Sequence, residues 1–177
     1  MNSTGIPLHQ FWAKTTLDNK PGLSVRDHCL CIGYVAQALL ERLPVHVRAM
    51  LPAGIVSLIA LHDVGKISPG FQLKRKFWET LIASGLLARD WRFAETFHAA
   101  VSHAIIGNWL GLDRAGYAVV AGGHHGKLPV YTDIPEIGTH GRNERDELED
   151  PVFACPRNEL RKIVEETFGP LPDAPAG

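Results

Sequence analysis

The sequence predicts an all-α fold, and three observations support that prediction. Apolar residues recur at the three- and four-residue spacing of helices in several segments. No segment shows the sustained alternation of apolar and polar residues that marks a half-buried strand. The chain has 177 residues and a hydrophobic share of 45%, which suit one domain with a packed core. We therefore expect a single helical bundle over residues 1–177.

The first long helix is expected to begin at a capping box. Ser24 and Asp27 stand three residues apart, directly before an apolar stripe that continues to about Leu43. The stripe has helical spacing and consists of Val25, His28, Ile32, Val35, Ala36, Leu39 and Leu43. Upstream, the aromatic and basic segment 11–14 is expected to pack on the core in preference to touching a ligand.

The middle of the chain predicts a buried helix. Residues 45–51, which lie between two prolines, are expected to form a short helix or turn. The apolar run 54–64 predicts a buried helix that Gly65 ends, and residues 67–72 are expected to form a loop.

The second half predicts three further helices and two irregular segments. Helical spacing favours helices over residues 93–112, 114–121 and 157–168. Residues 132–156 are rich in Gly, Pro and mixed charges, which is typical of a mobile loop or linker. The Pro-rich tail 169–177 is expected to be frayed.

Composition excludes several classes of protein. The net charge of −1 gives no general polycation field, so nucleic-acid binding would need a local basic patch. No apolar run is long enough to span a membrane, and the first ten residues lack the layout of a secretory signal. The three cysteines form no C-x-x-C zinc pattern and suit a reducing compartment. We therefore expect a cytoplasmic protein.

Histidines are the unusual feature of this composition. Seven of the nine lie between His28 and His125. Periodicity places imidazoles on the core side or at the end of four separate helices, and it places Asp63 toward the interior. Imidazole is a costly core filler, and an unpaired buried carboxylate costs several kcal/mol. Metal binding explains all of these positions at once, with His28, His62, Asp63, His98 or His103, His124 and His125 as candidate ligands.

The number and type of these ligands favour hydrolytic metal chemistry. Six ligands are enough for two ions about 3.5–4 Å apart, with Asp63 as the natural bridge because a carboxylate has two oxygens. Imidazole-rich sites without thiolates suit Mn, Fe, Co, Ni or Zn. Lys66, and with it Lys127, would stabilise charge on a phosphoryl oxygen. These residues together favour hydrolysis of a phosphoester.

A basic segment beyond the His–Asp pair offers a candidate nucleic-acid contact. Lys74, Arg75 and Lys76 are flanked by Phe71, Phe77 and Trp78. Basic side chains neutralise phosphates and aromatic rings stack on bases, so this composition suits a single strand. A solvated helix face with one buried aromatic explains the segment equally well.

These motifs together resemble the HD phosphohydrolase superfamily, whose name comes from the His–Asp pair. More narrowly, the chain is similar to the HD nuclease domain of the signature helicase-nuclease of type I CRISPR systems. The block 62–72 is the most specific part of the resemblance, because its Pro-x-Phe-Gln ending is rare in other members of the superfamily. The other matching motifs, in chain order, are residues 11–14, 24–28, 98–102 and 123–126.

The resemblance implies a helical HD domain with a central metal site in a core of about residues 11–130. It favours His98 over His103 as the ligand, because the family places a His four residues before a Ser on this helix. It also implies endonuclease and possible exonuclease activity on single-stranded DNA. The implied partners are a superfamily 2 helicase, in the same or another polypeptide, and the RNA-guided Cascade complex. The chain itself lacks the Gly-x-x-x-x-Gly-Lys-Ser/Thr motif of an ATP site.

The sequence departs from the family pattern in one respect. The family adds a late Asp on a helix after the His–His pair, whereas Asp133, Asp146 and Asp150 here fall in the expected loop and Asp173 in the tail.

Two rival functions also fit the sequence. A phosphohydrolase that acts on free nucleotides is the first rival. A non-catalytic, metal-stabilised domain that docks on a helicase is the second.

Overall fold

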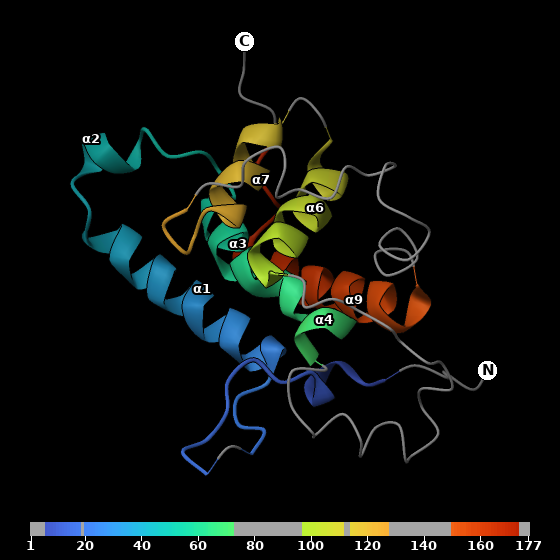
Figure 1. Cartoon of the computed structure of the whole chain (residues 1–177). Coiled ribbons are helices and arrows are strands. Elements are labelled where there is room, and N and C mark those ends of the chain that lie inside the picture. Colours follow the sequence, from blue (N-terminus) through green and yellow to red (C-terminus); the bar gives the residue numbers. More distant parts are fainter. Residues whose placement is uncertain (1–5, 19, 73–96, 112–113, 128–149, 174–177) are drawn as a thin grey trace.

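Helices make up the regular structure of the described residues in this computed structural model (Figure 1). The structure describes residues 6–18, 20–72, 97–111, 114–127 and 150–173. Within these ranges no sheet forms, and extended pairing is limited to the isolated bridges Trp12–Ser24 and Thr15–Pro21. The prediction of an all-α fold is therefore confirmed. No helix among the described residues has the length and apolarity that crossing a bilayer requires.

The centre of the fold is a short 3₁₀ helix, η2, which carries the His–Asp pair. It contacts α1, α3, α4, α6, α7 and α9, so most of the described helices pack around it. In Figure 1, α2 stands at the outer end of α1, away from this centre. The elements in chain order are η1 (Leu8–Gln10), α1 (Val25–Arg42), α2 (Val45–Arg48), α3 (Ile55–Ala60), η2 (Leu61–Lys66), α4 (Pro69–Gln72), α6 (His98–Leu110), α7 (Ala115–Gly122) and α9 (Pro151–Phe168).

Helix α1 begins at the predicted capping box. The backbone N–H of Asp27 donates to Ser24 Oγ at 3.0 Å, and Ser24 Oγ donates to Asp27 Oδ2 at 2.8 Å. The cap fixes the first turn of the helix and thereby the position of His28, one turn further on.

The predicted apolar stripe of α1 is wrong in its outer half. Val35 and Leu39 are 55% and 63% exposed, whereas Cys29 and Gly33 are buried beside Val25. The reason is a close approach at Gly33, where an added Cβ would lie 2.3 Å from the ring of Phe168. Because glycine has no Cβ, this face of α1 packs closely on Phe168 of α9, and Val35 and Leu39 lie on another face of the helix.

The predicted helix over 54–64 is two elements. Helix α3 ends at Ala60, and the chain tightens into η2, which continues to Lys66. In a 3₁₀ helix, residues three apart eclipse one another, so Lys66 stands over Asp63. Gly65 does not stop the helix as predicted. It lets α6 approach, since an added Cβ would lie 2.1 Å from the His98 carbonyl oxygen and 2.5 Å from Ser102 N.

The boundaries of two other segments also differ from prediction. The expected loop 67–72 contains the short helix α4, and α9 begins at Pro151, so residues 151–156 are helical and not part of a loop. Asp150 caps α9 by accepting a hydrogen bond from the backbone N–H of Val152 at 2.9 Å. Residues 73–96 and 128–149 lie outside the described residues, and so does most of the expected loop.

The segment after α9 is packed rather than frayed. Leu171 is 5% exposed, and Ser57 Oγ donates a hydrogen bond to the Gly169 carbonyl oxygen. An added Cβ at Gly54 would lie 2.3 Å from the carbonyl oxygen of Pro170. The described part of the tail, to Asp173, therefore lies against the start of α3.

Candidate metal centre

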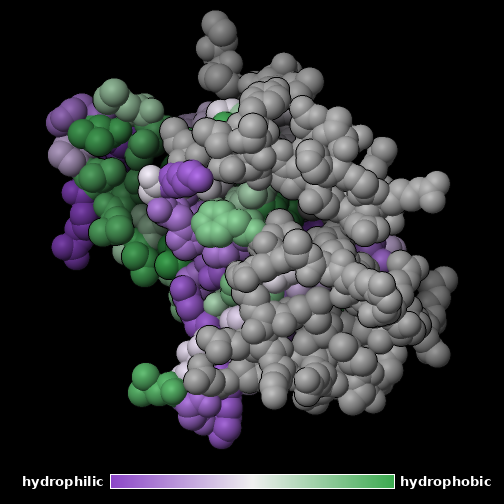
Figure 2. All heavy atoms as spheres, viewed as in Figure 1, coloured by the Kyte–Doolittle hydropathy of each residue, from purple (hydrophilic) through white to green (hydrophobic). Residues whose placement is uncertain are grey.

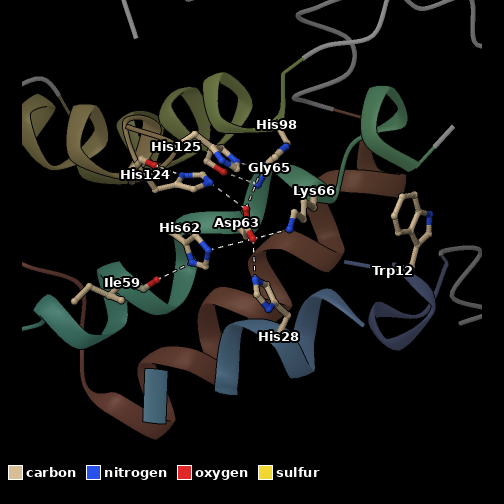
Figure 3. Close-up of polar contacts among 12 residues, drawn as sticks. Trp12, His28, Ile59, His62, Asp63, Gly65, Lys66, His98, His124 and His125 are labelled. Carbon is tan, nitrogen blue, oxygen red and sulfur yellow. Dashed lines mark hydrogen bonds and ion pairs between the residues drawn. The ribbon is translucent and has the colours of Figure 1, made fainter. Parts of the chain in front are cut away.

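Four imidazoles converge on the carboxylate of Asp63 (Figure 3). Asp63 Oδ2 lies 2.8 Å from His28 Nε2 on α1 and 3.1 Å from the adjacent His62 Nε2. Asp63 Oδ1 lies 3.1 Å from His98 Nε2 and 3.3 Å from His124 Nε2. His98 is the first residue of α6, and His124 follows the end of α7. The carboxylate thus faces a different pair of imidazoles with each of its oxygens.

The ligand atoms fall into two groups. His28, His62 and Asp63 form one group, and His98, His124 and His125 form the other. Within each group the ligand atoms lie within 4.8 Å of one another. In the second group, His125 Nε2 lies 3.0 Å from His98 Nε2. Because Asp63 Oδ1 faces the second group, the carboxylate joins the two.

The hydrogen bonds around these imidazoles fit a divalent cation. His62 Nδ1 donates to the Ile59 carbonyl oxygen at 3.0 Å, and His124 Nδ1 donates to the Ala121 carbonyl oxygen at 2.6 Å. A carbonyl only accepts, so each neutral ring carries its lone pair on Nε2. In that neutral form both lone pairs face Asp63, and a divalent cation would take them and the carboxylate as ligands; in a protonated ring Nε2 donates to the carboxylate instead. Asp63 Oδ1 and His124 Nε2 are also buried without a hydrogen-bond partner.

The electrostatics of Asp63 favour its ionised form. Burial opposes ionisation of this carboxyl, because the Asp63 side chain is only 4% exposed. The surrounding contacts of His124, His28, His62 and His98 outweigh burial and hold the pKa of Asp63 well below its usual range. Two imidazoles of the second group shift in opposite directions. Desolvation lowers the pKa of His98 although its contact with Asp63 opposes that shift. In His124 the contacts with Asp63 and with the Ala121 carbonyl oxygen outweigh desolvation and raise the pKa.

Lys66 is buried against the carboxylate. Its Nζ donates to Asp63 Oδ2 at 2.7 Å and lies 5.4 Å from the centre of the Phe71 ring. Desolvation lowers the pKa of Lys66, and the attraction of Asp63 opposes that shift. The ammonium group is therefore directed at Asp63 and is only 5% exposed as a side chain.

The structure brings the six candidate ligands together and places His103 apart from them. His103 lies toward α7, where Ala118 is its backbone partner and burial lowers its pKa, so His98 is the one that joins the cluster. Lys127 is exposed, two residues beyond His125. Lys74, Arg75 and Lys76 lie outside the described residues. Asp173 is fully exposed near Arg114.

Two buried side chains behind the site were missed by sequence reasoning. Gln72 Nε2 donates to the carbonyl oxygen of Lys66 at 2.8 Å and to that of Trp12 at 3.0 Å. Arg157 Nε, from α9, donates to the carbonyl oxygen of Ile67 at 2.7 Å. Both hold the backbone that leaves η2. Gln72 is the last residue of the specific motif 62–72, so the sequence contained a signal for it. Arg157 is a single Arg in an amphipathic helix, and such a residue gives no signal of a buried role.

A helical bundle that buries a His–Asp pair among further imidazoles defines an HD-type metal hydrolase. The comparison with family models returned the family described as "Cas3, HD domain", matched over residues 12–174. The chain therefore belongs to the Cas3 HD-domain family. It is accordingly a metal-dependent nuclease or phosphohydrolase of CRISPR systems, in a family that works with a helicase and nucleic acid. Neither the search of curated proteins nor the search of solved structures returned a match.

Proposed function

We propose that the chain is a nuclease that hydrolyses phosphodiester bonds of single-stranded DNA during CRISPR interference. The observation that carries the proposal is the pair of ligand groups joined by Asp63. Two ions held about 4 Å apart form the arrangement that enzymes use for in-line displacement at a phosphodiester. Family membership supplies the biological setting.

Each ligand has a proposed place at the centre. His28, His62 and Asp63 would hold one divalent transition ion (Mn, Ni, Co, Fe or Zn), and His98, His124 and His125 would hold a second. Such ions supply Lewis acidity and make water nucleophilic near neutral pH. The carbonyl oxygens of Ile59 and Ala121 orient the two imidazoles that bond to them.

Lys66 has a different proposed role from the one expected from sequence. Its contact with Asp63 Oδ2 supports holding the carboxylate ionised and in position, rather than direct contact with a phosphoryl oxygen. Lys127 is exposed and suits contact with the phosphates of a strand. Lys74, Arg75 and Lys76 are proposed to extend that contact. The helicase and the Cascade complex are the proposed partners.

The test of the proposal is cleavage of circular single-stranded DNA by the purified chain. Mn, Ni, Co and Mg are added in turn to chelator-treated protein, because circular substrate has no ends and its cutting is endonucleolytic. We expect linear and shorter products with transition ions. Asp63→Ala should abolish the products, and normal cleavage by that variant would contradict the site assignment.

Parallel reactions separate the proposal from the two rival functions. Release of phosphate from free nucleotides, with intact circular DNA, would identify a nucleotide phosphohydrolase. Metal-loaded protein that acts on neither substrate would identify a non-catalytic docking domain.

A further inference from the structure

Phe97, next to the metal centre, is the most exposed phenylalanine of the described residues. Its side chain is 51% exposed, whereas Phe11, Phe71 and Phe153 are all buried. Burying a Phe side chain stabilises a protein by roughly 1.5–3 kcal/mol, so an exposed ring gives up much of that contribution. On the face shown in Figure 2, other apolar residues gather mainly over α2 and the adjoining end of α1.

The position of Phe97 is fixed by the first turn of α6. Phe97 is the N-cap residue with extended backbone, and its carbonyl oxygen accepts from Ala100 N at 2.9 Å. Its ring lies 5.4 Å from the ring of His98 and 5.3 Å from the ring of His125, centre to centre. The aromatic side chain is therefore held beside two members of the second ligand group.

The exposed side of the metal centre is the side where Phe97 lies. The side chains of Asp63, His98 and His28 are 4%, 10% and 11% exposed. Those of His124 and His62 are 17% and 19% exposed, whereas His125 is an exposed residue. A phosphodiester that reaches the ions would enter past His125. The bases that flank this phosphate would then pass beside the ring of Phe97.

We propose that Phe97 is a base-stacking residue, which holds a nucleobase next to the phosphodiester that is cut. This inference rests on the proposed nuclease function and adds the part of the strand that the site recognises beyond its phosphates. Aromatic rings stack on every base, so the contact gives little sequence preference. It favours an unpaired strand, because the bases of a duplex are already stacked on one another.

The experiment compares a normal single strand with a strand of the same length that carries abasic sites around one mapped cleavage position. Removing one stacked base or its aromatic partner should cost about 5- to 150-fold in kcat/KM. We expect Phe97→Ala to lose that factor on the normal strand and to match wild type on the abasic strand. Phe97→Trp should restore cleavage of the normal strand.

Two measurements separate stacking from a structural role. Tyr34→Ala removes another exposed aromatic ring, on α1, and should cleave both strands like wild type. Fluorescence anisotropy of labelled strands, without metal, should show weaker binding by Phe97→Ala for the normal strand alone. Bound metal, measured by elemental analysis, should be unchanged in Phe97→Ala.

The outcomes distinguish this inference from the proposed function. If wild-type protein cuts neither strand with any transition ion, the proposed function fails and the inference fails with it. If wild-type protein cuts but Phe97→Ala loses activity equally on both strands, or loses none, the stacking role is wrong and the nuclease function stands.

Discussion

Asp63 is the central residue among the candidate ligands. Both of its oxygens contact imidazoles, and Lys66 adds a buried ammonium group to Oδ2. These contacts hold the pKa of Asp63 well below its usual range, so the carboxylate stays ionised in spite of its burial and can serve as a ligand for a cation.

Asp63→Asn tests the charge of this residue with little change in shape. The amide should leave far-UV circular dichroism close to wild type but greatly weaken metal binding, since a neutral amide is a poor ligand for these ions. Asp27→Asn is the matched control, because Asp27 serves the cap of α1 and lies outside both ligand groups. Full metal loading of Asp63→Asn would refute the bridging role.

The three cysteines should differ in reactivity. Cys29 is fully buried and desolvation raises its pKa, whereas Cys31 and Cys155 are exposed. Because the thiolate is the nucleophile, native protein should react with iodoacetamide at Cys31 and Cys155 only, and denatured protein at all three. Peptide mass spectrometry reads the sites, and native labelling of Cys29 would show that the packing of α1 is wrong.

At the scale of elements, η2 sets the geometry of the site. Its 3₁₀ winding brings Lys66 over Asp63, and Gly65 lets the first turn of α6 come close enough to present His98. Gly65 N also donates to Ser102 Oγ at 2.9 Å, which fixes η2 to α6. The two elements form one unit, so a change at their contact should disturb both ligand groups.

Gly65→Ala should destabilise the fold and disrupt the site. An added methyl group would meet the backbone of α6, and such overpacking costs about 3 kcal/mol. Gly116→Ala in α7 is the control, since nothing lies within 4 Å of an added Cβ there, and it should stabilise by about 0.5–1 kcal/mol. Urea unfolding measures both. Equal stability of the two variants would contradict the close packing of η2 on α6.

Removing the side chain of Arg157 should destabilise the fold more than removing that of Arg161, its neighbour on α9. Arg157→Ala leaves the Ile67 carbonyl oxygen without this donor in a buried place, which costs about 2–3 kcal/mol. Arg161→Ala removes a partly exposed pair with Glu165 and should cost about 0.5 kcal/mol. Urea unfolding of the two variants gives the comparison, and similar losses would show that Arg157 does not support η2.

At the scale of the whole molecule, helical periodicity predicted the fold class and the convergence of the histidines. It did so because a buried imidazole or carboxylate needs a partner in the core, and helices that each bury such a group can share one. It did not predict the 3₁₀ form of η2, the packing role of Gly65, or the outward turn of Val35 and Leu39. Those features depend on contacts between elements far apart in the sequence, which local spacing does not encode. Periodicity also left His98 and His103 open, and the structure separates them by the element that each one faces.

The count of bound metal ions tests the central claim most directly. Chelator-treated protein is dialysed against Mn²⁺ or Co²⁺, and the metal content is measured by elemental analysis. The two ligand groups joined by Asp63 predict about two ions per chain, held about 3.5–4 Å apart, which for Mn²⁺ gives the electron paramagnetic resonance spectrum of a coupled pair. No bound metal, or a single ion that His28→Ala and His125→Ala both leave in place, would contradict a two-ion centre.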